Sequence, residues 1–244
     1  MSKRFFVDQP ITQDAAELTG TEAEHVVKVL RGKVGDLVTL FDGGGAEFPA
    51  RITAIGRSSV ALAVLARYDV SRELATEVTL GVALPKGDRQ RWLVEKAVEL
   101  GVSRLVPLIT ERGVAEPNEA TIGRLRRYVI EAAKQCGRNR LLQVHTPQRL
   151  DEFSGRACRV ALRLLAHAGP DAAPLAELPA SGPEHAVDCA VGPEGGFTDE
   201  ELAAADGWQR VSLGPRILRV ETAAITMAAW FSLRDAMRLV RLPG

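Results

Sequence analysis

Two loops near the end of the chain carry the residue types best suited to chemistry on a small polar ligand. The first is VGPEGGF, from Val191 to Phe197, and the second is LGPRILRVETA, from Leu213 to Ala223. Each loop follows an apolar strand and opens a helix, where backbone N–H groups point outward and glycine allows close approach of a ligand. We therefore expect the two loops to wall one pocket.

The second loop adds charge to this pocket. Arg216 and Arg219 suit a phosphate or a developing anion, and Glu221 gains from its place at a helix start. Taken singly, these residues are better explained as two solvated arginines and a helix cap. Neither a Walker A motif nor G-x-G-x-x-G follows a strand here, so kinase and Rossmann dehydrogenase functions lose their main support.

Composition is that of an ordinary globular enzyme. The 244 residues are 46% hydrophobic and 25% charged, with a formal net charge of zero, which suits one or two domains. The cysteines Cys136, Cys158 and Cys189 show no C-x-x-C spacing, and the histidines are far apart, so neither a disulfide framework nor a metal site is expected. The chain start lacks a signal-peptide pattern and no stretch is long enough for a membrane span, so we expect a cytoplasmic protein.

The first part of the chain reads as β structure. Apolar residues alternate over 37–41, 48–52 and 60–64, which predicts a small antiparallel barrel or meander. Before it, Thr21 and Glu24 form a capping-box pattern for a short helix that stops near Gly32. The polar stretch 68–73 is the best linker, and we place domains at 1–70 and 71–244.

The second part alternates strands with long helices, which is typical of an α/β sheet with parallel strands. Thr198 and Glu201 form a second capping-box pattern, after the first loop. The expected strands are 78–84, 104–108, 160–165, 186–191 and 210–213, and the expected long helices are 88–100, 119–136 and 221–240.

Basic residues concentrate between Ile122 and Arg140. This segment holds Arg124, Arg126, Arg127, Lys134, Arg138 and Arg140 against one acid, Glu131. In a chain of zero net charge, such a segment favours contact with a nucleic-acid backbone. A solvated helix face remains the alternative.

The two loops, in this order and spacing, resemble the SPOUT-class RNA methyltransferases that methylate N3 of a uridine in bacterial 16S ribosomal RNA. The resemblance extends along the chain through RFF from Arg4, HVVKVLR from His25, PKG from Pro85, EKAVELGV from Glu95 and EAAKQCGR from Glu131. We regard the combination as specific.

The resemblance implies an α/β protein with an N-terminal PUA-like RNA-binding β-barrel and a C-terminal SPOUT domain. That domain is tied in a deep trefoil knot, binds S-adenosylmethionine and pairs two subunits into a homodimer. The expected partner is 16S ribosomal RNA of the small subunit. Two alternatives stay open, namely a SPOUT methyltransferase with another RNA target and a non-catalytic RNA-binding assembly factor.

Methylation of a ring nitrogen needs positioned substrates, a proton acceptor and positive charge near the pyrimidine oxygens. Our hypothesis assigns positioning to the two loops, anion stabilisation to Arg219 or Arg138, and proton acceptance to Glu221. The cofactor residues follow from the resemblance position by position. The chain departs from the family pattern in two places. The loop after the strand expected at 160–165 retains His167 but lacks the acidic residue expected shortly after it, and the segment 138–143 lacks the proline expected near its end. The expected cofactor residues are Leu165, His167, Gly192, Pro193, Glu194, Gly195, Gly196, Leu213, Gly214, Ile217, Leu218, Thr222 and Ala223. The expected RNA-binding residues are Arg4, His25, Arg31, Lys86, Arg124, Arg127, Arg140 and Arg216.

Overall fold

A computed structural model describes residues 3–155, 162–178 and 186–241 of the chain. Cys158 and the first two residues of the strand expected at 160–165 lie outside the described residues. The backbone divides into two compact units, one formed by Met1–Glu73 with Ile130–Leu141, the other by Leu74–Val129 with Leu142–Gly244. The segment Ile130–Leu141, which the sequence places in the second domain, thus clusters with the first unit.

The first unit is a five-stranded sheet in the order β1-β3-β4-β5-β2. Its strands are β1 (Arg4–Phe6), β2 (Ala15–Thr19), β3 (Leu37–Phe41), β4 (Glu47–Ile55) and β5 (Ser59–Val64). The three alternating segments read from the sequence are β3, β4 and β5, and their antiparallel pairing is confirmed. The sequence did not identify the short strands β1 and β2, and β1 pairs with β3 in parallel.

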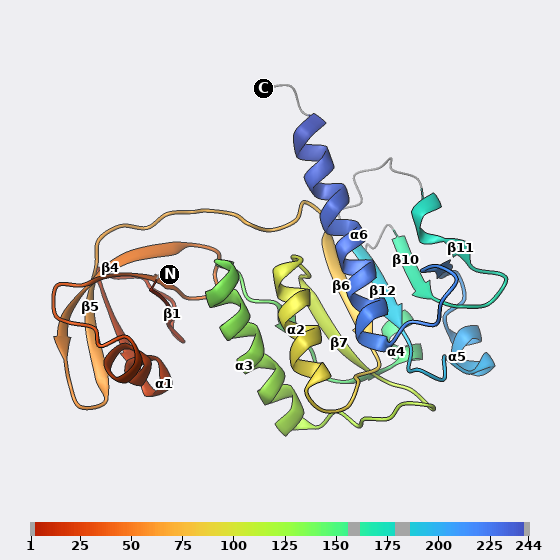
Figure 1. The fold of residues 1–244 in the computed structure, drawn as a ribbon, viewed down its shortest axis with the longest axis horizontal. Helices are drawn as coiled ribbons and strands as arrows, with labels where there is room; N and C mark the ends of the chain where they lie inside the picture. Colours follow the sequence, from red (N-terminus) through yellow and green to blue (C-terminus); the bar gives the residue numbers. More distant parts are fainter. Residues whose placement is uncertain (1–2, 156–161, 179–185, 242–244) are drawn as a thin grey trace. The chain divides into compact units, whose positions relative to one another are not determined.

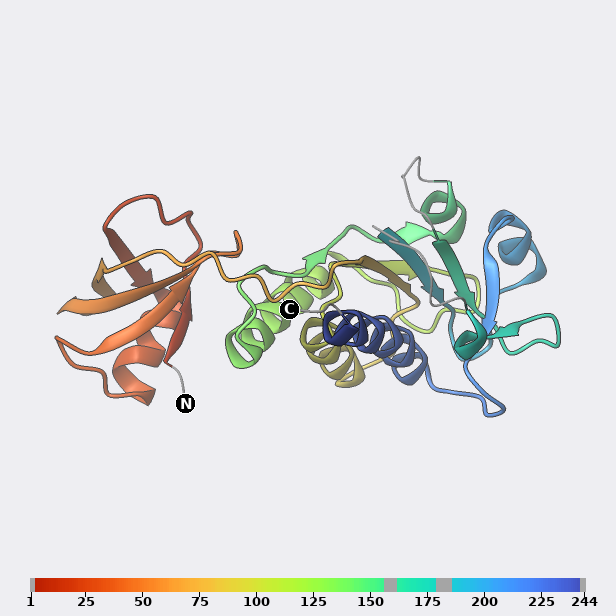
Figure 2. The same cartoon turned by 90° about the horizontal axis from the view of Figure 1, so that it is seen from above.

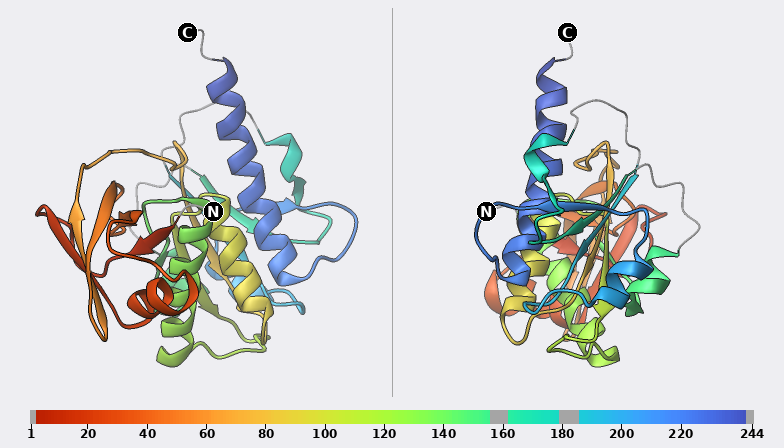
Figure 3. Two further views of the ribbon diagram at one scale, coloured as in Figure 1. Left: turned by 60° about the vertical axis from the view of Figure 1, so that its left-hand side comes forward. Right: turned by 90° about the vertical axis from the view of Figure 1, so that its right-hand side faces the viewer.

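A short helical segment packs against this sheet (Figure 3, left). It consists of α1 (Gly20–Glu24) followed by one π-helical turn, η1 (His25–Val29). The expected helix is present, but the capping box at Thr21 is wrong, because the N-cap is Thr19, two residues earlier, and its side chain makes no capping hydrogen bond. Arg31, just beyond η1, has a left-handed backbone with φ of 49°.

A buried polar network lies within the first unit. The side chain of Arg4 is 8% exposed and donates to Glu47 Oε2 at 3.0 Å and to Asn139 Oδ1. Arg72 donates to the same Glu47 oxygen at 3.1 Å. Burial raises the pKa of Glu47, but the hydrogen bonds from Arg72 and Arg4 outweigh it and leave that pKa below its ordinary value.

Replacing Glu47 by Gln is expected to lower the free energy of unfolding by about 1–3 kcal/mol at neutral pH, because it leaves the buried Arg4 without its counter-charge. The folded-state pKa of Glu47 is depressed, so the ionic contribution is complete above the ordinary glutamate pKa and is lost as the pH falls through the lower folded value. Urea unfolding of both proteins between pH 7 and pH 3 should show the difference shrink below about pH 4. A difference independent of pH would contradict this assignment.

The second unit is a parallel sheet in the order β11-β13-β10-β12-β6-β7-β8, with β9 paired to β7 beside this path. Every strand pair recorded in it is parallel, which confirms the expected α/β architecture. The strands are β6 (Glu77–Val82), β7 (Arg104–Ile109), β8 (Gln143–Val144), β9 (Gln148–Arg149), β10 (Leu162–Ala166), β11 (Ala173–Pro174), β12 (Ala186–Val191) and β13 (Gln209–Ser212).

Helices cover both faces of the central strands, as parallel sheets require (Figure 2). The long helices α2 and α6 lie side by side on one face (Figure 1), and the short α4 and α5 lie on the other, as the edge-on view also shows (Figure 3, right). Helix α3 begins in the second unit and ends in the first. The helical segments are α2 (Arg89–Glu99), α3 (Glu119–Cys136), α4 (Leu150–Ser154), η2 (Leu175–Glu177), α5 (Asp199–Ala204) and α6 (Val220–Arg241).

Candidate functional site

Three neighbouring strands of the second unit end at the same level of the sheet. Ala166, the last residue of β10, is in register with Val191 at the end of β12 and with Val211 near the end of β13. In parallel α/β sheets, ligands bind at the carboxyl ends of the strands. The loops that follow β10, β12 and β13 therefore meet at the edge where a ligand site is expected.

The loop after β12 is held in a tight turn. Gly196 N donates to Pro193 O at 2.8 Å, and the φ of Gly196 is 71°, a conformation that favours glycine. A Cβ on Gly192 would lie 3.0 Å from the Phe197 ring, so the ring packs where only glycine leaves room. Thr198 and Glu201 form the expected capping box at the start of α5, with bonds of 3.2 and 2.9 Å.

The loop after β13 is more exposed. Gly214 has a φ of 114°, and Ile217 at its outer edge is 78% exposed. The loop ends where Ala223 N donates to Arg219 O at 2.9 Å, in the first turn of α6. This second loop is therefore fixed at its helix end and open to solvent at its tip.

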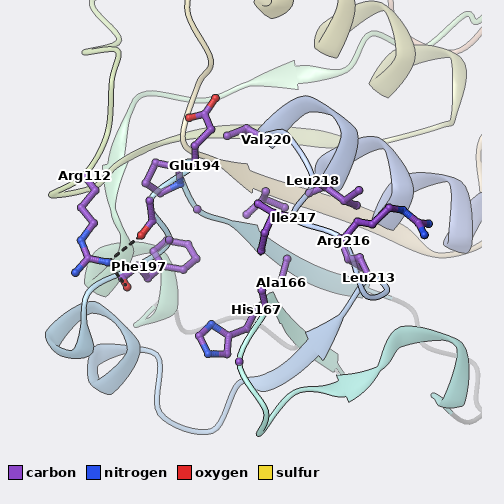
Figure 4. Close-up of a pocket in the computed structure, with 18 of the residues that line it drawn as sticks. Arg112, Ala166, His167, Glu194, Phe197, Leu213, Arg216, Ile217, Leu218 and Val220 are labelled. Atoms are coloured by element: carbon purple, nitrogen blue, oxygen red, sulfur yellow. Dashed lines mark hydrogen bonds between the residues drawn. The ribbon is translucent and has the colours of Figure 1, made fainter.

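Together the three loops enclose a cavity of about 340 Å³ (Figure 4). All but two of the residues expected to bind the cofactor line it, and so does Arg216, which was expected to bind RNA. The exceptions are Leu165, which is buried in the core behind the cavity, and Thr222, which is exposed on α6. The cavity confirms that the two loops wall one pocket.

Arg112, which also lines the cavity, fixes the first loop. Its Nη1 donates to the backbone oxygen of Gly195 at 2.8 Å and reaches that of Phe197 at 3.5 Å (Figure 4). Sequence reasoning missed Arg112, although its place after the parallel strand β7 puts it at the same edge of the sheet as the loops.

A second arginine joins the two loops. Arg89, at the start of α2, lies with Nη1 3.2 Å from Glu194 Oε1 and 3.6 Å from Glu221 Oε2. The Glu221 side chain is 8% exposed, and its Oε2 has no hydrogen-bond partner among the described residues. Arg89 therefore supplies the cation between a carboxylate of the first loop and a carboxylate at the start of α6.

His167 lies at the base of the cavity in the view of Figure 4. Its Nε2 is 3.5 Å from Asp171 Oδ1, and the other Asp171 oxygen accepts a hydrogen bond from Arg210 Nη1. The bond from Arg210 lowers the pKa of Asp171 below its ordinary value. Asp171, four positions after His167, is therefore an acidic partner of the histidine, although the sequence comparison placed none shortly after it.

Arg138, one of the two candidates for anion stabilisation, is 3% exposed in the first unit. Its Nε and Nη2 donate to the two carboxylate oxygens of Glu73 at 2.9 and 2.5 Å. Lys134, from the same basic segment, is paired with Glu22 at 2.7 Å. Acids from distant parts of the chain therefore neutralise part of the charge that the local sequence counts as unbalanced.

The residues expected to bind RNA differ in exposure. Arg4 lies in the buried network of the first unit, which places it inside the protein rather than on the surface. His25 packs edge-on against Phe5, and Arg124 donates to Gln90 Oε1 at 3.0 Å. The side chains left exposed to a nucleic acid are Arg31, Lys86, Arg127, Arg140 and Arg216.

Within residues 3–155, 162–178 and 186–241, no three His, Cys, Asp or Glu side chains gather into a group that could hold a metal ion. No helix of that same part of the chain has the length and apolar character to cross a membrane.

Two family models match successive parts of the chain. Residues 72–232 match a family model described as an RNA methyltransferase domain, and residues 18–65 match an RNA methyltransferase PUA domain. Ribosomal RNA small subunit methyltransferase E of Synechocystis is 36% identical over 88% of this chain and 72% of its own.

Solved structures show the same fold. Ribosomal RNA small subunit methyltransferase E of Neisseria gonorrhoeae, bound to S-adenosyl methionine, is 30% identical with a TM-score of 0.85, over 98% of each chain. A methyltransferase of Legionella pneumophila in complex with the cofactor SAM is 32% identical with a TM-score of 0.87, over 96% of this chain and 98% of its own.

Proposed function

Because this chain belongs to the ribosomal RNA small subunit methyltransferase E family, we propose that it transfers a methyl group from S-adenosylmethionine to N3 of a uridine in bacterial 16S ribosomal RNA. The observation that carries the proposal is the single cavity formed by the GPEGGF and LGPRILRVETA loops within the matched methyltransferase domain. The protein is an S-adenosylmethionine-dependent RNA methyltransferase.

The residues that line the cavity suit this cofactor. The volume of about 340 Å³ lies within the range of small-molecule sites. Glu194 offers a carboxylate to the positive sulfonium and amine, and Arg216 offers a guanidinium to the carboxylate end. Phe197 and Leu218 provide apolar surface for the adenine ring. We assign these residues to holding the cofactor.

The bound cofactor supplies a methyl group on a cationic sulfur, which becomes a neutral thioether when the carbon–sulfur bond breaks. The new bond forms at uridine N3, so the N3 proton must leave. We assign its acceptance to the Glu221 carboxylate, whose Oε2 lies 3.6 Å from Arg89 and accepts no hydrogen bond among the described residues. Arg219 is exposed and stands between the cavity-lining residues Leu218 and Val220. We assign it to offsetting negative charge on the pyrimidine oxygens.

We propose that residues 1–70, which contain the matched PUA domain, form the RNA-binding domain, and that residues 71–244 form the methyltransferase domain. We further propose that the loops around the cavity are tied in a trefoil knot, that two copies pair through this domain, and that the enzyme works in the cytoplasm. The partly exposed apolar residues Trp92 on α2 and Leu233 on α6 support the pairing.

Calorimetric titration distinguishes this function from an assembly factor without catalysis. S-Adenosylmethionine is expected to bind the purified protein with a stoichiometry of one molecule per chain. RNA binding in the absence of any cofactor binding would support the assembly-factor alternative and remove the proposed chemistry.

Arg31 allows RNA binding to be separated from folding. Its left-handed backbone costs an ordinary residue about 1–2 kcal/mol, a cost that glycine avoids. Replacing Arg31 by Gly is therefore expected to leave the thermal midpoint unchanged or higher. The same change is expected to weaken RNA binding and to lower the slope of log affinity against log salt by about 0.7–0.9, as for one lost phosphate contact.

The conservative control is Arg31→Lys, which keeps the charge and is expected to keep the slope. Filter binding across a salt series with both variants gives the comparison. An unchanged slope in Arg31→Gly would remove Arg31 from the RNA-binding surface.

A further inference from the structure

We propose that Asp171, Arg210 and Gly169 are positioning residues that hold His167 in the orientation and tautomer with which it contacts the cofactor. The inference rests on the proposed function, since it concerns the same cavity. It adds residues that neither the sequence motifs nor the family resemblance assigns.

The backbone of His167 is fixed first. His167 N donates to Val211 O at 2.9 Å, which ties the end of β10 to β13. Arg210 precedes Val211 on that strand, so its guanidinium reaches the Asp171 carboxylate from the strand that also anchors His167. A turn closed by Ala172 N and Gly169 O, at 3.2 Å, brings Asp171 back toward the histidine.

Gly169 makes room for this arrangement. A Cβ at position 169 would overlap His167 Nε2 and lie 2.7 Å from Asp171 Oδ1. The two side chains thus fold over the bare backbone of a residue that also lines the cavity. Because the overlapping atoms are the ends of flexible side chains, an alanine at position 169 displaces the pair without disturbing the backbone.

Fold stability does not explain the contacts. The side chains of His167, Asp171 and Arg210 are 25%, 48% and 38% exposed, and ion pairs that exposed contribute little to stability. Their common feature is the cavity, which His167 lines. Orientation of the imidazole is the role that remains.

The contact also selects a tautomer. Asp171 Oδ1 lies 3.5 Å from Nε2, and a carboxylate oxygen at that side of the ring favours a proton on Nε2 over one on Nδ1. We therefore assign the Nε2–H form to the neutral ring, with Nδ1 as an acceptor. An acceptor at the base of the cavity suits a hydroxyl or amino donor, and the adenosine part of the cofactor carries both kinds of group.

The test is the affinity for S-adenosylmethionine, measured by calorimetry, of the full chain and of Asp171→Asn, Arg210→Gln and Gly169→Ala. Each variant is expected to bind about threefold to tenfold more weakly, on the scale of one weakened hydrogen bond. Asp199→Asn, at an exposed carboxylate in the first turn of α5, is the matched control and is expected to bind normally. Nitrogen NMR of the histidine ring should report the Nε2–H form in the parent and a mixture of tautomers in Asp171→Asn.

A double variant isolates the positioning role. If Asp171 acts through the histidine, adding Asp171→Asn to His167→Ala is expected to cause no further loss of affinity. A further loss, or a single variant with unchanged affinity and tautomer, would overturn the inference while cofactor binding by the parent leaves the proposed function standing. Failure of the parent to bind S-adenosylmethionine would overturn both.

Discussion

Replacing Glu221 by Gln is expected to lower kcat for methyl transfer by about 10²- to 10⁴-fold, the usual contribution of a positioned base. The affinity for S-adenosylmethionine is expected to stay within about threefold, because Glu221 does not line the cavity that would hold the cofactor. The carboxylate is nearly buried, carries an oxygen without a hydrogen-bond partner among the described residues, and stands one residue from the cavity-lining Val220. Single-turnover kinetics with calorimetry on the same preparations separates the two effects.

The matched control is Glu200→Gln, since Glu200 is an exposed glutamate in the first turn of another helix, α5. It is expected to leave kcat unchanged. Normal turnover by Glu221→Gln, with a lower thermal midpoint, would show that Glu221 serves the helix start alone.

Replacing Arg89 by Gln is expected to be the second most damaging change, with cofactor affinity reduced by about tenfold to a hundredfold. Arg89 is the cation shared by Glu194 and Glu221, at 3.2 and 3.6 Å. Without it, Glu194 in the first loop and the nearly buried Glu221 at the start of α6 lose the cation that they share, so the first loop is no longer tied to α6. Arg89 and Glu194 are both partly exposed, so solvent screens their ion pair and limits the loss of cofactor affinity.

The comparison variant is Arg91→Gln, two residues along α2, where the arginine pairs with Glu95 on the helix surface. Its cofactor affinity is expected to match the parent. An Arg89→Gln variant that binds the cofactor normally would show that the two loops keep their places without this cation.

Local signals in the sequence predicted much of what the structure contains. Alternating apolar residues located β3, β4 and β5, and the strand–helix alternation located the parallel sheet. The two glycine loops were expected to form one pocket because they follow strands of that sheet, and they do. These features depend on neighbours in the chain, which is why they can be read from it.

The remaining features depend on partners far apart in sequence. Nothing near Arg138 shows that Glu73 neutralises it, and nothing near Arg89 shows that it meets Glu194 and Glu221. The ion pair of Asp171 with Arg210 requires two strands to lie side by side. The short strand β1 was missed because three residues show no periodicity.

The most direct test is nucleoside mass spectrometry of small ribosomal subunits taken from a strain that lacks the protein. The subunits are incubated with the purified protein and labelled S-adenosylmethionine. We expect label in 3-methyluridine, at one site in 16S ribosomal RNA. Cofactor binding with label in a different nucleoside, or with no label in RNA, would contradict the proposed reaction.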